Sequence, residues 1–329
     1  MKKTLAIVVL TWNDFFNTTK CIKSIYPQLD DTTKLILVDN DSDEKIYNKT
    51  INWIKNKYKN NYLHLKKKSK FLQYKKKIII LRNNKNLGCG FGHNSGYEFA
   101  IRNNFEFVAR VDNDMLVPRK FFIEILKNFN NKIIQGVSPK ILYTHNPERI
   151  WWMGTKIGNS LKTQTHMRDY PYGLKDNKKY SGVINTDAIA GCASIMRTSR
   201  LKKVGLSDKD FFYGPEDIEF SRRIYDKPGS LIVDRNIKIY HAVTQSFKPQ
   251  HSFRRQYFEH KYRLLLINKI GTYSDKIIGY SISIIKFFLY CVFGFKQKQR
   301  KKIRPVLKSL IDFFIFKRYG DFDRKINNH

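Results

Sequence analysis

The chain has 329 residues, 42% hydrophobic and 14% aromatic, so it can bury a substantial core and is not a disordered polypeptide. Its 62 Lys and Arg residues against 28 Asp and Glu give a net charge of +34, which favours anionic partners, although genomic composition bias explains part of the excess equally well. The four cysteines lie far apart without a C-x-x-C spacing, so they indicate neither a zinc site nor a disulfide framework and fit a reducing cytosol.

The N-terminal region is typical of alternating strands and helices. Residues 5–10 and 34–38 are short β-rich runs, and residues 17–26 between them carry apolar side chains at helical spacing. Residues 1–10 contain two lysines and an apolar run, but no small-residue cleavage site follows. We therefore interpret this run as a buried first strand rather than a signal peptide.

The alternation continues further along the chain. Residues 78–81 predict a third strand, residues 94–103 a helix, and residues 105–111 a fourth strand that leads directly into Asp112. Such alternation predicts a mostly parallel sheet covered by helices. Because ligands bind beyond the carboxyl ends of strands in these sheets, Asp39 and Asp112 are candidate ligand-binding residues.

Two segments depart from this pattern. Residues 56–77 are rich in lysine, with interspersed Tyr, Leu and Phe, and predict an inserted basic loop or helix. The composition changes again near residue 250, so we predict a first domain over residues 1–250 and a helical, basic and apolar region over residues 251–329.

The C-terminal region has the composition of a membrane-associated segment. Residues 277–295 are apolar apart from small polar residues and Lys286, and five basic residues follow within 296–302. A lysine at the centre of a bilayer costs about 2.5–3.5 kcal/mol, which favours a helix lying on an anionic membrane over one that spans it. Residues 306–316 predict a further amphipathic helix that fits either the membrane or the main domain.

The sequence Asp112-Asn113-Asp114 offers two carboxylates one residue apart at a strand end. Carboxylates are natural ligands for a hard divalent cation, which can neutralise a diphosphate leaving group. Asp39 at a neighbouring strand end can reach the same crevice. Asp and Asn also favour turns, so the triplet alone is more typical of a turn than of a ligand site.

The surrounding sequence adds further candidate residues. Residues 83–96 contain glycines that would let the backbone approach a ligand before a helix begins, without a dinucleotide or P-loop motif. Glu216 and Asp217 follow aromatic residues and Pro215, and this pattern fits either a general base or an ordinary helix start. His241 follows an apolar segment and is either a metal ligand or a structural histidine.

Taken in order, these segments resemble glycosyltransferase family 2, the inverting transferases with a GT-A fold, and in particular its rhamnosyltransferase-like members that extend bacterial surface polysaccharides. The resemblance covers roughly residues 4–265. It rests on residues 8–13, 37–42, 86–96 and 111–114, and further on residues 190–197, 204–217 and His241.

The resemblance implies a role for each matching residue. Contacts to the donor nucleotide are implied for Thr11, Asn13, Asp39, Asn40, Asn94, Asp112 and Asn113. The metal ligands would be Asp112, Asp114 and His241, with Mn²⁺ or Mg²⁺ as cofactor. Asp217 would be the catalytic base, and Glu216 would position the base or the acceptor. Residues 254–263 depart from the family by carrying His260-Lys261 in place of an Arg-Asn pair.

The predicted protein is thus an α/β, GT-A (Rossmann-like) glycosyltransferase with a C-terminal helical appendage. The resemblance implies a nucleotide-sugar donor, with dTDP or UDP favoured, and a glycan or lipid-linked acceptor in O-antigen-like or capsule-like synthesis. We predict a cytoplasmic protein on the inner face of the plasma membrane that binds no specific nucleic acid. The alternatives are a haloacid-dehalogenase-like phosphatase, which also uses D-x-D, and a non-enzymatic basic nucleic-acid or membrane-binding protein.

Overall fold

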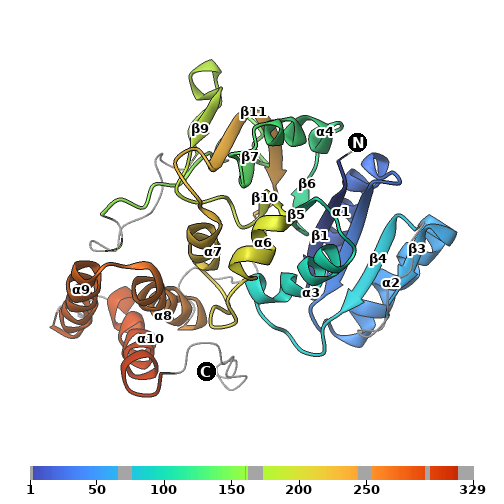
Figure 1. Ribbon diagram of the computed structural model, residues 1–329. Coiled ribbons are helices and arrows are strands. Elements are labelled where there is room, and N and C mark those ends of the chain that lie inside the picture. Colours follow the sequence, from blue (N-terminus) through green and yellow to red (C-terminus); the bar gives the residue numbers. More distant parts are fainter. Residues whose placement is uncertain are drawn as a thin grey trace.

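The computed structural model describes residues 3–65, 76–159, 161, 173–243, 253–292 and 297–317, and their strands form one sheet of eleven (Figure 1). One half of this sheet is parallel throughout. Its strands follow the order β3 (Tyr62–His64), β4 (Ile78–Arg82), β2 (Thr33–Asp39), β1 (Leu5–Thr11) and β5 (Phe107–Asp112).

The other half of the sheet is mixed. Next to β5 lies β10 (Ala193–Arg197), which is antiparallel both to β5 and to β7 (Gly136–Tyr143). Beyond β7 come β11 (Leu231–His241), which is parallel to it, and β6 (Met115–Leu116), which is antiparallel to β11. Two short strands pair at the side, β8 (Ile150–Trp152) with β7 and β9 (Val183–Asn185) with β11.

Helices cover both faces of the sheet. Successive residues of a strand point to opposite faces, and in the central strands both sets of residues are apolar. In β1, Leu5, Ile7 and Val9 pack with α1 (Phe15–Ile25), α2 (Glu44–Tyr58) and α4 (Phe121–Leu126). The intervening Ala6 and Val8 pack with α3 (Cys89–Arg102), α6 (Thr198–Val204) and α7 (Glu216–Ile224) on the opposite face. Short 3₁₀ helices occupy Tyr26–Gln28, Lys59–Asn61, Lys127–Asn130 and Lys178–Tyr180.

Three C-terminal helices form a separate cluster beside α7 (Figure 1). They are α8 (Phe253–Ile270), α9 (Tyr273–Val292) and α10 (Gln297–Phe314), and they share an apolar core with Phe211 and Phe212. The boundary predicted near residue 250 falls in residues 244–252, outside the described residues. Of the described helices, none has the length and apolar character needed to cross a membrane.

The predicted fold class is confirmed, with differences in detail. The helix predicted from residue 94 begins at Cys89. Its first turns contain Gly90 and Gly92, which are buried, so packing outweighs their low helix propensity. Only part of the predicted insertion can be placed. Residues 56–58 complete α2 and residues 62–64 form β3, while residues 66–75 lie outside the described residues.

Candidate active site

The carboxyl ends of three neighbouring parallel strands bring the predicted acidic residues to one edge of the sheet. Thr11 is paired with Asp39 across β1 and β2, and Leu10 is paired with Asp112 across β1 and β5. This is the edge at which parallel α/β sheets bind ligands. Three residues predicted to contact the donor are therefore neighbours in space.

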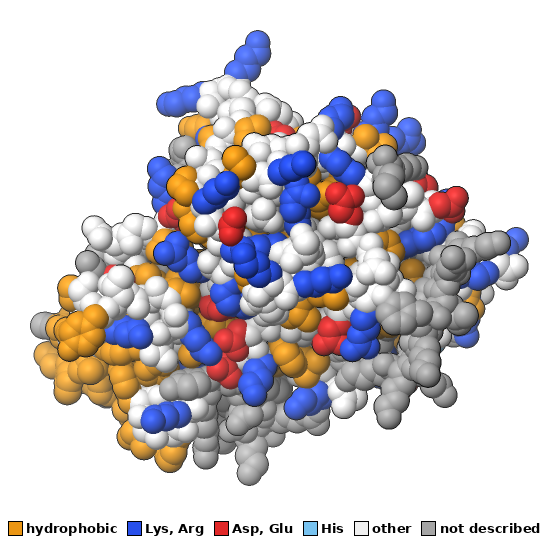
Figure 2. Space-filling view, viewed as in Figure 1, with side chains coloured by type: hydrophobic (Ala, Val, Ile, Leu, Met, Phe, Trp, Pro, Cys, Tyr) orange, Lys and Arg blue, Asp and Glu red, His pale blue; other side chains and the backbone are white. Residues whose placement is uncertain are grey.

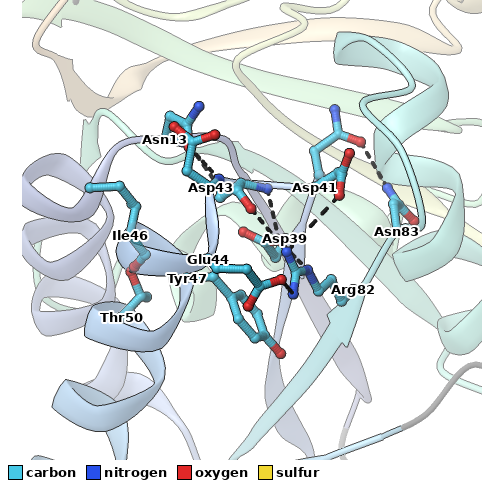
Figure 3. A network of polar contacts seen from close by, with 12 residues as sticks. Asn13, Asp39, Asp41, Asp43, Glu44, Ile46, Tyr47, Thr50, Arg82 and Asn83 are labelled. Atoms are coloured by element: carbon cyan, nitrogen blue, oxygen red, sulfur yellow. Dashed lines mark hydrogen bonds and ion pairs between the residues drawn. The ribbon is translucent and has the colours of Figure 1, made fainter.

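Asp39 lies in a polar network that joins the loops after β1 and β2 (Figure 3). Its Oδ2 accepts a hydrogen bond from the Ser42 N–H at 3.1 Å and lies 3.2 Å from Arg82 Nε. Burial raises the pKa of Asp39 above its ordinary value, against the opposing effects of Ser42 and Arg82. Asn13 is exposed, has a left-handed φ of 52°, and accepts a hydrogen bond from the Asp43 N–H at 2.7 Å.

Arg82 is a residue of this network that the sequence motifs did not reveal. Its guanidinium lies 2.6 Å from Glu44 Oε1, donates to the Ser42 carbonyl at 2.9 Å, and stacks 4.0 Å from the centre of the Tyr47 ring. Figure 3 shows Arg82 beside Asp39, with Glu44 and Tyr47 next to it. The rule of binding at strand ends would have indicated Arg82, because it is the last residue of β4.

The start of α1 connects the β1 end with the acidic triplet. Thr11 Oγ1 and Thr18 Oγ1 share a hydrogen bond of 2.7 Å, and Asn113 Nδ2 donates to Thr18 Oγ1 at 3.0 Å. Asp14 caps the helix by accepting from the Asn17 N–H. Thr11 and Asn113 are thus held by the same helical turn.

Asn40 is occupied inside the protein. Its side chain is 2% exposed, and its Nδ2 donates to Asn86 Oδ1 at 2.9 Å and to the Gly88 carbonyl at 3.1 Å. Its Oδ1 accepts from Asn83 Nδ2 and from the Leu87 N–H. These contacts show that Asn40 holds the loop before α3, and its predicted contact with the donor stays a prediction.

Asn94 has a similar structural position. Its Nδ2 donates to the Ser207 carbonyl at 2.8 Å, and its Oδ1 accepts from the Ser207 N–H at 3.0 Å. This two-way pairing fastens α3 to the segment that leads to Glu216. The contact with the donor predicted for Asn94 stays a prediction, and in this structure both of its amide atoms bond to Ser207.

The glycines of residues 83–96 also pack against protein rather than exposing backbone to a ligand. A Cβ on Gly88 would lie 2.2 Å from the Phe212 carbonyl oxygen, and one on Gly90 would lie 2.6 Å from Glu216 Cγ. A hydrogen bond of 2.9 Å from the Cys89 N–H to the Phe212 carbonyl joins the same two segments. The glycines were expected to admit a ligand, and instead they admit the segment that carries the Glu-Asp pair.

The triplet forms a turn between β5 and β6, and it also places its two carboxylates in the site. The Asp112 N–H donates to the Cys192 carbonyl at 2.9 Å, which fixes the end of β5 against the residue before β10. Asp114 Oδ2 lies 3.2 Å from His241 Nε2, at the end of β11. The turn and the functional interpretation are therefore compatible.

Arg110 lies two residues before Asp112, and its buried guanidinium group is surrounded by carboxylates. It is 3% exposed, its Nη2 lies 3.0 Å from Glu216 Oε1, and its Nε lies 3.9 Å from Asp112 Oδ1. His93 Nε2 is 3.8 Å from the same Asp112 oxygen, and burial lowers the pKa of His93 well below its ordinary value. Arg110 is thus the cation that connects the triplet with the Glu-Asp pair.

Asp217 lies in the first turn of α7, after Pro215 at the N-cap position. Its Oδ2 accepts from the Gly191 N–H at 3.0 Å, and its Oδ1 accepts from the Ile218 N–H at 2.9 Å. Burial raises the pKa of Asp217 to about 6, and the neighbouring Glu216 adds to this rise. A carboxylate with this pKa is suited to accept a proton near neutral pH.

The predicted metal ligands are partly assembled. Ligands at adjacent positions of an octahedral ion with bonds of about 2.1 Å lie about 3.0 Å apart, which fits the 3.2 Å between His241 Nε2 and Asp114 Oδ2. Asp112 Oδ1 accepts no hydrogen bond from the described residues, and burial raises the pKa of Asp112 to about 7. A dication would favour the charged form of this carboxylate. Among the described residues, however, no three His, Cys, Asp or Glu side chains form a complete metal cluster.

Comparison with known families identifies the class of protein. The model of glycosyl transferase family 2 matches residues 6–205, and the chain belongs to this family. No curated protein sequence matches the chain. The alternative of a phosphatase receives no support from the family match.

Solved structures share the fold at low sequence identity. TarS from S. aureus, residues 1–349, is 14% identical with a TM-score of 0.50, over 95% of this chain and 82% of that one. The mannosyltransferase PcManGT from Pyrobaculum calidifontis is 14% identical with a TM-score of 0.54, over 94% and 74%. GalNAc-T7 is 12% identical with a TM-score of 0.54, over 96% of this chain and 58% of that one. The chain therefore has the GT-A fold of these glycosyltransferases.

We expect Arg110→Met to lower the free energy of unfolding by about 3–5 kcal/mol, because it leaves the Glu216 carboxylate buried without its cation. Urea denaturation measures this loss. The double variant Arg110→Met/Glu216→Gln should lose less than the sum of the two single variants, since the uncompensated charge is gone. Additive losses would show that Arg110 and Glu216 are not energetically coupled.

Proposed function

We propose that the chain is a metal-dependent inverting glycosyltransferase. It moves a sugar from a nucleoside-diphosphate donor to a hydroxyl of a glycan or lipid-linked glycan in cell-surface polysaccharide synthesis. One observation carries the proposal. The Asp112 N–H donates a hydrogen bond to the Cys192 carbonyl, and the N–H of the preceding residue, Gly191, donates to the Asp217 carboxylate. A candidate base therefore lies one strand away from the acidic triplet.

The donor nucleotide is assigned to the ends of β1 and β2. Thr11, Asn13 and Asp39 lie there, and the buried Asp39 carboxylate can accept hydrogen bonds from a nucleobase. We favour a UDP or dTDP donor. The fold accommodates such ligands in similar proteins, since GalNAc-T7 was solved with UDP, GalNAc and Mn²⁺, and PcManGT with GDP-Man and Mn²⁺.

The diphosphate is assigned to the triplet. Asp112, Asp114 and His241 are the residues that would hold Mn²⁺ or Mg²⁺. When bound, such a cation stabilises negative charge on the departing diphosphate. Asn113 lies between the two carboxylates in the sequence, and its Nδ2 is held by a hydrogen bond to Thr18 Oγ1.

The acceptor side is assigned to the Glu-Asp pair. The Asp217 carboxylate accepts the proton of the acceptor hydroxyl, and the freed oxygen attacks the anomeric carbon opposite the leaving diphosphate, which inverts its configuration. Glu216 is held at its Oε1 by Arg110 and serves to position the base or the acceptor. The backbone bonds from Gly191 and Ile218 keep Asp217 in one orientation, so little reorganisation is needed during transfer.

We also propose that transfer takes place on the cytoplasmic side of the plasma membrane. Two features support this location: the net charge of +34 and the largely apolar sequence of the C-terminal helix α9.

The variant Asp217→Asn should lower the transfer rate by about 10²–10⁴-fold and leave donor binding unchanged, because the amide keeps the shape but cannot accept the proton. The rate is measured with radiolabelled nucleotide-sugars, and donor binding by calorimetry. Asp226→Asn, which changes a carboxylate paired with Arg200 at the surface, is the matched control and should transfer at the wild-type rate. Turnover of Asp217→Asn within a few-fold of wild type would remove Asp217 from this role.

The transfer rate should rise with pH through about 6, because the charged form of Asp217 is the active base and its pKa is about 6. Between pH 5 and pH 7 the charged fraction, and with it kcat/KM, increases about tenfold. A pH series of kcat/KM tests this, with the unfolding temperature followed at each pH. A rate that stays level across this interval would contradict the assignment.

Removal of divalent cations with EDTA should abolish transfer and weaken nucleoside-diphosphate binding at least tenfold, and Mn²⁺ or Mg²⁺ should restore both. His241→Ala should raise the metal concentration needed for half-maximal activity. Thermal-shift measurements with UDP, dTDP and GDP, each with and without Mn²⁺, also identify the donor base. Full activity in EDTA would show that the transfer is metal-independent.

A further inference from the structure

The helix α9 has the reverse of the usual distribution of polarity. Its buried positions are Asp275, Gly279 and Ser283, which are small or polar. Its exposed positions recur every three or four residues, so they lie along one face, and eight of the eleven are large and apolar. Between 41% and 81% of each of these side chains is exposed: Tyr273, Ile277, Ile278, Ile284, Ile285, Phe288, Leu289 and Val292.

The end of α10 extends this apolar face. Tyr280 of α9 packs against Phe313 and Phe314, with ring centres 5.7 and 5.3 Å apart. Phe314 is 40% exposed, and Ile315 and Phe316 directly after the helix are 68% and 53% exposed. Figure 2 shows hydrophobic side chains gathered at the lower left, where Figure 1 places α9.

The concentration of these side chains is unusual for a protein surface. Of the 17 large hydrophobic residues exposed among the described residues, 12 lie between Tyr273 and Phe316. The others, such as Phe16 on α1 and Ile123 on α4, are scattered over the catalytic domain. Isolated exposed apolar residues are normal, whereas a continuous patch indicates an interaction surface.

The charge next to the patch indicates what covers it. Among the described side chains of residues 273–317, the only acidic ones, Asp275 and Asp312, are buried, while six are basic: Lys276, Lys286, Lys302, Arg304, Lys308 and Lys317. An apolar helical face flanked by cations is typical of a helix that lies in the interface of an anionic bilayer. Two copies of this chain meeting through the patch would bring these cations together, which disfavours self-association.

The same helices contact the segment before the Glu-Asp pair. Phe212 stacks on Phe258 of α8 with ring centres 5.7 Å apart, and Phe211 lies 5.8 Å from Tyr262. On its other side, α8 is held by α10, where the Tyr257 hydroxyl donates to Asp312. A surface that binds α9 and α10 is therefore connected through α8 to the acceptor side of the site.

We propose that the exposed face of α9 and the end of α10 bind an anionic lipid surface, with α9 parallel to the membrane plane. Its apolar side chains enter the boundary between headgroups and acyl chains, and the flanking Lys and Arg contact lipid phosphates. In this position α8 would hold the segment that carries Glu216 and Asp217 close to the bilayer, where a lipid-linked acceptor could reach it. This consequence rests on the proposed function. The lipid binding itself does not depend on catalysis.

The test is sedimentation of the full chain with vesicles of phosphatidylglycerol and phosphatidylcholine, compared with phosphatidylcholine alone. Wild type should bind the anionic vesicles more tightly and lose this preference at high salt. The variant Ile277→Gln/Ile285→Gln/Phe288→Gln should lower binding to anionic vesicles at least tenfold. The matched control, Ile123→Gln/Ile133→Gln/Val183→Gln, removes three exposed apolar side chains from the catalytic domain and should bind as wild type does.

Nucleoside-diphosphate binding in solution, measured on the same variants, separates this proposal from the proposed function. Retained nucleotide binding with lost vesicle binding supports the lipid surface and shows that the α9 variant is folded. Vesicle binding with no nucleotide binding or transfer by wild type would overturn the proposed function alone. Equal vesicle binding by the α9 variant and wild type would overturn the lipid surface. So would a wild-type dimer that the variant converts to a monomer, which would identify a second copy as the occupant.

Discussion

The ion pair between Arg110 and Glu216 is the contact on which the arrangement of the candidate site depends. Arg110 comes from β5 and Glu216 from the start of α7, and both side chains are almost completely buried. Two charges removed from water persist only when each compensates the other. The pair therefore fixes the distance between the strand that ends in the acidic triplet and the helix that carries Asp217.

Close packing supports this ion pair from the other side. Gly90 leaves the space that Glu216 Cγ occupies, and Gly88 lets the Phe212 carbonyl approach α3. A larger side chain at either position would displace the segment that carries Glu216 and Asp217. The buried amides act in the same way, since Asn94 binds Ser207 through both its nitrogen and its oxygen. The loop before α3 thus supports the segment that carries Glu216 and Asp217, which we propose as the acceptor side, and the proposed donor side relies on the ends of β1, β2 and β5.

The C-terminal helices extend the same chain of contacts away from the sheet. The aromatic side chains of α8 pack on Phe211 and Phe212, a few residues before Glu216. Because α10 packs on α8 and α9 packs on both, the position of these helices is coupled to that of the segment that carries Glu216 and Asp217. In the arrangement we propose, one helical cluster serves two purposes: it binds lipid on its outer face and supports the acceptor side on its inner face.

The parallel half of the sheet, and the strand ends at which two acidic residues lie, follow from local sequence patterns. Strand runs such as Leu5–Thr11 are apolar at successive positions, which is the pattern of a strand buried on both faces, and a residue directly after such a strand lies at the ligand-binding edge. Asp39 and Asp112 could be found in this way, whereas Asp217 was indicated by the Glu-Asp pattern after Pro215 and by the resemblance to the family.

Contacts between segments far apart in the sequence determine which side chains are held inside the protein and which stay exposed at the candidate site. Asn40 and Asn94 carry the same groups as Asn13, but burial and contacts with residues distant in sequence occupy them. The role of Arg110 depends on a partner 106 positions away, and the reversed polarity of α9 depends on which of its faces meets α8 and α10. Local patterns specify neighbours along a helix or a strand, whereas these contacts arise only when the folded chain brings remote segments together.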